Sequence, residues 1–309
     1  MTRVCLIVVF NHKYIKNITK LRKTYKGKFS DVFYLVPFFD NSDHIKINNK
    51  TDDIIPVYES SYNFQGYFAQ AFQRIKQDKY DSFVFVADDM IINPSINENN
   101  IFDYIGIETD DSYIKQIEPF GHSGGSNSNR LYSVLHPFCA NSGVTYKSEI
   151  INYEEACKKC INNSLIIDKH IGFKYFRLNY KGFLKPQNFL LFISILIKNK
   201  GLRLRYPLYS GYSDFIIISK SSIESFVKNC GVFSAMNIFV ETAVPTAMAI
   251  SCNGIKTEKD IKLRGIEYWG KDIERFEKKY EYSISKLNKS FGHNILYYHP
   301  VKLSKWKND

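Results

Sequence analysis

The sequence of 309 residues lacks the long apolar runs and the cysteine patterns that mark several classes of protein. No run reaches the roughly 18 apolar residues that a membrane-spanning helix needs. The apolar stretch at 4–10 is short and has no small-residue cleavage site, which favours a first strand over a signal peptide. The six cysteines form no disulfide framework, and Cys157-x-x-Cys160 has no second pair at zinc spacing. We therefore expect a reducing compartment and a cytoplasmic protein.

Patterns typical of nucleic-acid binding are also missing, although the net charge is +11. The sequence contains no zinc-finger pattern, no recognition helix and no basic stretch interleaved with aromatic residues. The basic residues at 13–28 fall at near-helical intervals, which is typical of a solvated helix face. We therefore expect no nucleic-acid partner.

Strands and helices alternate along the first 90 residues. Apolar runs predict strands at 3–10, 31–37, 54–57 and 82–87, and amphipathic patterns predict helices at 14–24 and 64–79. This alternation predicts an α/β fold with a mostly parallel, twisted sheet flanked by helices. Right-handed crossovers place the ends of the first, second and fourth strands at one edge of that sheet.

The pattern weakens after residue 101. We expect a loop at 122–129, a helix at 154–162 and strands at 215–218 and 295–298. A helix from 222 should end at Cys230-Gly231. A further helical stretch at 235–250 should be kinked or restarted by Pro245. No interdomain linker is evident, so we expect one continuous domain.

Two adjacent carboxylates, Asp88 and Asp89, follow the apolar run at 82–87. Unpaired carboxylates would be costly in a buried position, so acids where a buried strand ends suggest a ligand crevice. Hard oxygen ligands suit Mg²⁺ or Mn²⁺, which commonly carry a diphosphate. Neighbouring strand residues face opposite ways, so both acids bind one ion only if the strand has ended. The alternative is a turn or a helix cap.

Four segments together resemble the GT-A-fold glycosyltransferases, a family with a nucleotide-binding α/β half. They are Val9-Phe10-Asn11 after the first strand, Ala87-Asp88-Asp89, the acid-bearing Phe239-Val240-Glu241-Thr242, and Tyr298-His299-Pro300-Val301-Lys302. The pair Asp88-Asp89 departs from the family's commoner Asp-x-Asp, and the middle hundred residues match no pattern of the family. The resemblance is closest in style to bacterial enzymes that build lipopolysaccharide, capsule or related surface polysaccharides.

The resemblance implies a GT-A-like (Rossmann-type) sheet, with residues 1–100 as the nucleotide-sugar-binding half and residues 101–309 as an acceptor-binding α+β half. It implies transfer of a sugar from a nucleotide-sugar, with UDP favoured as carrier, to a glycan or lipid-linked acceptor. Asp89 and His299 would bind Mn²⁺ or Mg²⁺, and Asp88 would be a second ligand or a ribose partner. His293 competes with His299 for this role. Lys302 would pair with the diphosphate.

The general base and the nucleotide contacts follow from the same resemblance. Glu241 is the first candidate for the base of an inverting transfer, and Asp214 is the second. A retaining enzyme would need no such base. Nucleotide recognition would fall on residues at strand ends and at the start of the second helix, namely Phe10, Asn11, Asp40, Gln65 and Gly66.

Other interpretations of the sequence remain open. A nucleotidyltransferase also uses acids and a metal, but the segment 8–13 has no glycine for a phosphate-binding loop. A non-catalytic basic protein that binds membrane or nucleic acid is a further alternative. The apolar segment at 189–197 with the basic residues to 205 predicts either a helix on an anionic inner membrane surface or a buried helix.

Overall fold

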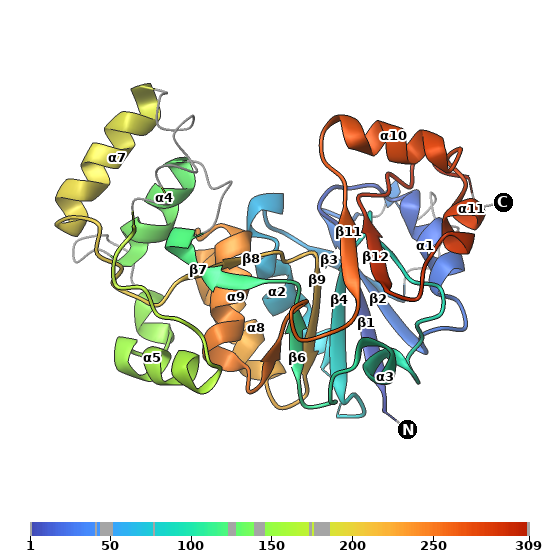
Figure 1. Ribbon diagram of the computed structural model, residues 1–309, viewed down its shortest axis with the longest axis horizontal. Helices are drawn as coiled ribbons and strands as arrows, with labels where there is room; N and C mark the ends of the chain where they lie inside the picture. The colour runs from blue at the N-terminus through green and yellow to red at the C-terminus, as the bar shows by residue number, and fades with distance from the viewer. Residues whose placement is uncertain are drawn as a thin grey trace.

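The computed structural model describes residues 2–40, 42, 43, 52–76, 78–122, 128–138, 146–172, 175 and 186–307. A seven-stranded mixed sheet with helices on both faces forms an α/β fold (Figure 1). Its strands, in spatial order, are β10 (Ile255–Lys256), β6 (Ser112–Ile114), β9 (Phe215–Ser219), β4 (Ser82–Ala87), β1 (Val4–Val9), β2 (Asp31–Pro37) and β3 (Ile54–Val57). Within this sheet only β9 runs against the others.

Two smaller sheets adjoin the large one. The first joins β11 (Arg264–Glu267), β12 (Ile295–His299) and β5 (Ile91–Ile92), and the second pairs β7 (Ile117–Pro119) with β8 (Tyr209–Gly211). The helices are α1 (Asn17–Tyr25), α2 (Gln65–Ile75), α3 (Ile101–Ile105), α4 (Ser128–Leu135), α5 (Tyr153–Asn162), α7 (Pro186–Asn199), α8 (Ile223–Ala235), α9 (Val240–Ser251), α10 (Lys271–Lys279) and α11 (Ile284–Lys289).

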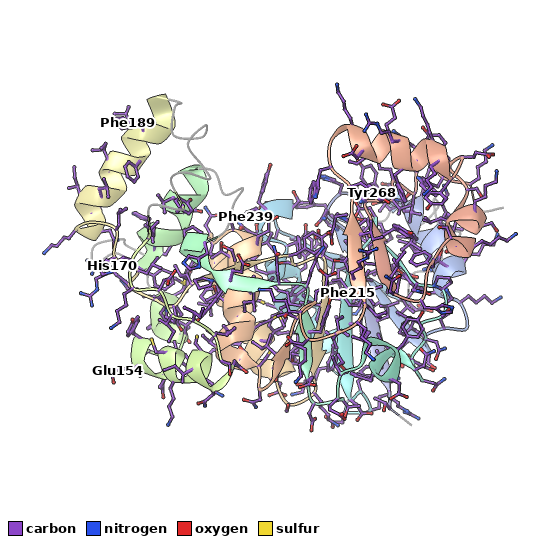
Figure 2. All side chains as sticks on the ribbon, viewed as in Figure 1. Glu154, His170, Phe189, Phe215, Phe239 and Tyr268 are labelled. Carbon is purple, nitrogen blue, oxygen red and sulfur yellow. The ribbon has the colours of Figure 1, made fainter. Side chains whose placement is uncertain are left out.

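Alternating side chains of the central strands enter two cores, one on each face of the sheet. In β1, Cys5, Ile7 and Val9 belong to one core and Val4, Leu6 and Val8 to the other. Successive residues of a strand point to opposite faces, so a strand that is apolar at every position must be covered on both sides. The cores are dense around Phe215, whereas Phe189 lies at the margin of the molecule on α7 (Figure 2).

The strands expected in the first 90 residues are confirmed, and their parallel pairing places the ends of β1, β2 and β4 at one edge. The expected end of a helix at Cys230-Gly231 is wrong, because α8 continues to Ala235. A Cβ on Gly231 would lie 2.8 Å from the Cβ of Ala69 in α2. Glycine at this position therefore allows close packing of two helices rather than ending one. Pro245 lies inside α9, and the expected loop at 122–129 falls mostly outside the described residues.

The second half of the chain completes the same sheet, because β6, β9 and β10 come from residues beyond 100. β5 follows directly after the segment that leaves β4 and pairs with β12, with Ile91 opposite Tyr298. This pairing brings the end of the last strand to the end of β4. Within the described part of the chain, every helix falls short of the length and apolarity needed to cross a bilayer.

Candidate functional site

One edge of the large sheet gathers the ends of its strands. Because β9 runs against its neighbours, its amino-terminal end lies at the same edge as the carboxyl ends of β4 and β6. Asp88 and Asp89 follow β4, Asp214 precedes β9, and Lys115 follows β6. Backbone bonds fix this arrangement, since the amide of Ala87 donates to the carbonyl of Asp214 over 2.8 Å. The residues of the site therefore come from strands far apart in sequence.

Asp89 and His299 form the centre of this edge. His299 Nε2 lies 3.0 Å from Asp89 Oδ1 and 3.8 Å from Asp214 Oδ2. The backbone amide of Val301 donates to the carbonyl of Asp89 over 2.6 Å, which anchors the segment after β12 to the segment after β4. The His299 side chain is 8% exposed and that of Asp89 is 32% exposed. A ligand from solvent therefore reaches this pair from the side of Asp89.

Charge and burial act on His299 in opposite directions. Burial alone would lower the pKa of its imidazole, but the hydrogen bond to Asp89 and the charges of Asp89 and Asp214 outweigh burial and raise that pKa. The imidazole is therefore favoured in its protonated form by the acids around it. A cation in the same position would meet the same attraction.

Tyr212 contacts the second ring nitrogen of His299, a role that no motif in the sequence predicts. Its hydroxyl lies 2.6 Å from His299 Nδ1, and its ring stacks on Tyr297 with an interplanar angle of 11°. The hydroxyl of Tyr297 donates to Glu267 over 2.6 Å, and Lys115 forms an ion pair with Glu267. The hydroxyl of Tyr212 therefore fixes the ring of His299. The one sequence signal was the position of Tyr212 two residues before Asp214.

Asp214 and Glu241 lie next to the pair. Burial raises the pKa of Asp214 to about 6, with a lowering contribution from His299 and raising contributions from Asp89 and Glu241. Glu241, in the first turn of α9, is therefore close enough for its charge to act on Asp214. A carboxyl group whose pKa lies near neutrality is suited to accept a proton.

Asp88 is buried beside Asp89 and contacts α1. It is 3% exposed, its carboxylate accepts from Asn17 Nδ2 over 3.4 Å, and the backbone amide of Asn11 also donates to it. Burial and the charge of Asp89 raise its pKa well above the usual range. Asp88 thus ties the segment after β1 to α1.

The donor atoms suit a divalent cation, although the described residues contain no group of three or more potential ligands. An octahedral Mg²⁺ with bonds of about 2.1 Å places neighbouring ligand atoms about 3.0 Å apart. The separation of Asp89 Oδ1 and His299 Nε2 is 3.0 Å. Such ions commonly use one or two protein ligands and complete their shell with phosphate oxygens and water. Asp89 and His299 therefore fit this kind of site.

The remaining predicted residues lie in different environments. Phe10 is fully buried against Tyr34, and Gln65 is fully buried with its amide nitrogen donating to the carbonyl of Ile238 over 2.8 Å. A Cβ on Gly66 would lie 2.5 Å from Ser234 Oγ, so this glycine allows close packing on α8. All three positions are therefore packed within the protein, and Gln65 Oε1 is buried without a hydrogen-bond partner among the described residues.

Polar predicted residues are more accessible. Asp40 is 55% exposed and pairs with Lys13 over 2.8 Å, which holds the pKa of its carboxyl below the usual range. His293 and Lys302 are both exposed. Asn11 follows β1, and its Oδ1 is buried without a hydrogen-bond partner among the described residues. An unpaired buried acceptor at this edge is a position that a ligand's donor group would satisfy.

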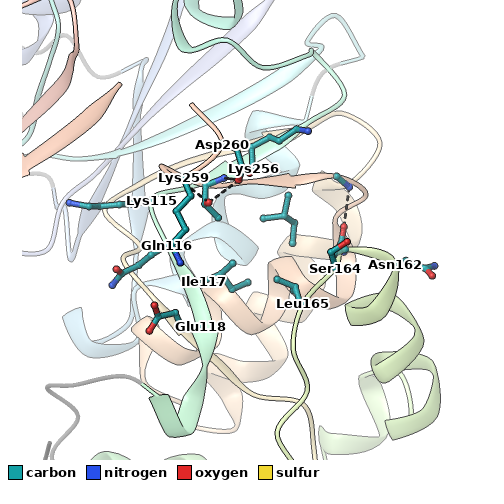
Figure 3. A pocket seen from close by; sticks show the side chains of 14 residues that line it. Lys115, Gln116, Ile117, Glu118, Asn162, Ser164, Leu165, Lys256, Lys259 and Asp260 are labelled. Carbon is teal, nitrogen blue, oxygen red and sulfur yellow. Dashed lines mark hydrogen bonds between the residues drawn. The ribbon is translucent and has the colours of Figure 1, made fainter. Parts of the chain in front are cut away.

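A cavity of about 410 Å³ adjoins the site at the far end of the edge (Figure 3). It is lined by the segments after β6, after α5 and around β10. Lys115 belongs to this lining and also pairs with Glu267 in β11. The cavity and the acid–histidine pair are therefore linked by a series of contacts that starts at Lys115 and reaches His299 through Tyr212.

No family model matches the chain, and no curated protein is significantly similar to it.

Proposed function

We propose that this chain is a GT-A-type glycosyltransferase, which moves a sugar from a nucleotide-sugar, with UDP as the favoured carrier, to a glycan or lipid-linked acceptor of bacterial surface polysaccharide. The observation that carries the proposal is the meeting of Asp89 and His299, 210 positions apart in sequence, at the edge where strands of the sheet end. Ligands of open α/β sheets bind outside the carboxyl ends of the strands.

Asp89 and His299 are the residues that would hold Mn²⁺ or Mg²⁺. When bound, the ion would stabilise the negative charge that develops on the diphosphate leaving group. Tyr212 keeps the imidazole of His299 in one orientation through Nδ1. Such outer contacts commonly fix the geometry of a metal-binding histidine.

Asp214 is better supported than Glu241 as the group that takes the proton from the acceptor hydroxyl. With a pKa of about 6, its carboxyl group is mostly ionised at neutral pH and is more basic than an ordinary aspartate. Glu241 supports this role, because its charge helps to raise the pKa of Asp214. The proton would move from the acceptor oxygen to an Asp214 carboxylate oxygen as that acceptor oxygen bonds to the sugar carbon, while the bond from this carbon to the phosphate oxygen breaks and the nucleoside diphosphate leaves with the electron pair.

The order of strands supports separate places for donor and acceptor. On one side of Asp89, the exposed rings of Phe38 and Tyr58 follow β2 and β3, with centroids 5.9 Å apart. The unpaired Oδ1 of Asn11 lies between these rings and Asp89 in strand order. On the other side is the cavity beyond β6. We assign the nucleoside to the side of β1–β3 and the acceptor to the side of β6 and β10.

A nucleotidyltransferase is less well supported. Such an enzyme binds phosphates with the loop after its first strand. Here the amide of Asn11 in that loop is used by Asp88, and Lys13 pairs with Asp40 and Asp43. The loop is therefore occupied by contacts within the protein.

The test is isothermal titration of the purified protein with UDP, GDP and CMP, each with and without Mn²⁺. We expect one nucleoside diphosphate to bind at least tenfold more tightly with Mn²⁺, and Asp89→Asn and His299→Gln to abolish this enhancement. Asp81→Asn is the matched control, because Asp81 lies at the opposite end of β4 and accepts from the amide of Arg3. Equal affinity with and without the metal for all three nucleotides would refute the proposal.

A further inference from the structure

Helix α7 presents a continuous apolar surface to solvent. Phe189, Leu190, Ile193 and Ile197 are 52%, 69%, 38% and 73% exposed. At 100° per residue these four positions fall within an arc of about 100° on one side of the helix. Most of the exposed leucine, isoleucine and phenylalanine side chains in the described chain lie on this helix. We call these four residues the α7 apolar face.

The opposite side of α7 holds the helix to the protein. Phe192 packs against the core on the α8 and α9 side of the sheet, and Asn199 is buried with its amide nitrogen donating to the carbonyls of Gly201 and Arg203. The helix lies beside α4, away from the large sheet, at the edge of the molecule (Figure 1). Among the residues that the structure describes, the α7 apolar face therefore takes little part in packing.

All the Lys, Arg, Asp and Glu residues in the sequence around α7 are Lys or Arg. From 169 to 213 it contains nine lysine and arginine residues and no aspartate or glutamate. This stretch accounts for most of the net charge of +11. Lys198, Lys200 and Arg203 are exposed at the carboxyl end of the helix. An apolar surface next to a cluster of positive charge matches the acyl chains and the anionic headgroups of a membrane surface.

We propose that α7 docks the protein on an anionic lipid bilayer, with the α7 apolar face below the headgroups and Lys198, Lys200 and Arg203 among them. At 1.5 Å per residue the helix is about 21 Å long, shorter than the roughly 30 Å hydrocarbon core, so it lies in the plane of the surface. A lysine or arginine near such a surface strengthens binding about fivefold. Insertion of a leucine or isoleucine side chain adds about tenfold or more.

Sedimentation with phospholipid vesicles tests this docking. We expect the full chain to bind vesicles of phosphatidylcholine with phosphatidylglycerol and to bind phosphatidylcholine alone at least tenfold more weakly. Raising the salt from about 0.1 M to about 1 M shortens the screening length from about 10 Å to about 3 Å and should weaken binding. Leu190→Glu/Ile197→Glu should remove binding, and Lys200→Gln/Arg203→Gln should weaken it about 25-fold, at about fivefold per charge.

Ile161→Glu/Ile166→Glu is the matched control, because these isoleucines are 64% and 66% exposed but lie at and beyond the end of α5. It should bind vesicles like the wild type, and circular dichroism should show that all variants fold. Unchanged vesicle binding by Leu190→Glu/Ile197→Glu would overturn the proposal. Failure of the wild type to bind anionic vesicles would also overturn it. This holds whether light scattering shows a monomer or a dimer that Leu190→Glu/Ile197→Glu dissociates. None of these results depends on glycosyl transfer.

Discussion

Removing the hydroxyl group of Tyr212 should weaken metal binding, whereas removing that of Tyr297, on which its ring stacks, should not. In Tyr212→Phe, His299 Nδ1 loses the hydroxyl that lies 2.6 Å away. The imidazole is 8% exposed, so water replaces the hydroxyl poorly. Loss of an outer contact to a metal-binding histidine typically weakens metal binding 10- to 100-fold, which corresponds to about 1.4–2.7 kcal/mol. The same range is expected for a buried polar atom that loses its partner.

The assay is titration of each variant with Mn²⁺ and UDP, together with urea denaturation. Tyr297→Phe is the control, because its ring stacks on Tyr212 but its hydroxyl donates to Glu267 and not to His299. Tyr297→Phe should lower the free energy of unfolding by about 1–3 kcal/mol and leave the affinity for Mn²⁺ and UDP within about threefold. Tyr212→Phe should weaken that affinity 10- to 100-fold. Equal affinities for the two variants would refute the role assigned to Tyr212.

Three further outcomes follow from the packing and from the pKa values. Gly231→Val should lower the free energy of unfolding by about 1–3 kcal/mol in thermal denaturation, because its side chain meets Ala69, whereas Gly172→Val, with nothing within 4 Å of its Cβ, should change it less. Since the fold raises the pKa of Asp214 to about 6 from 3.8, its ionisation opposes folding as the pH rises between these values. Asp214→Asn should therefore gain up to about 3 kcal/mol over the wild type above pH 6 in EDTA and nothing at pH 3, and an equal gain at both pH values would contradict this. Burial raises the pKa values of the Cys230 and Cys252 thiols, so a thiol reagent should modify Cys157 at least tenfold faster in the folded protein, as peptide mapping would show.

The central strands were predictable because their residues are apolar at every position. Runs such as Ser82–Ala87 have no polar face, and such a run must lie between two layers. Right-handed crossovers then fixed the shared edge of β1, β2 and β4. The position of Asp88 and Asp89 at that edge followed from the sequence alone.

The direction of each acid was not predictable from its neighbours. Asp88 turns toward Asn17 and Asp89 toward His299 because the chain leaves β4 in a turn at these residues. The end of α8 was missed for a similar reason, since Gly231 signals a helix end locally but meets Ala69 in the fold. The structural role of a glycine therefore depends on which residues pack against it in the folded protein.

The sequence by itself determined the layered α/β sheet and the edge at which the acids lie, because alternation and apolar runs are local properties of the chain. It also determined the basic, acid-free stretch around α7. Only the tertiary structure decided which polar groups meet. His299 reaches Asp89 through the pairing of β12 with β5, and Tyr212 reaches His299 because β9 runs against β4. Contacts between distant segments depend on strand order and direction, which no short stretch of sequence encodes.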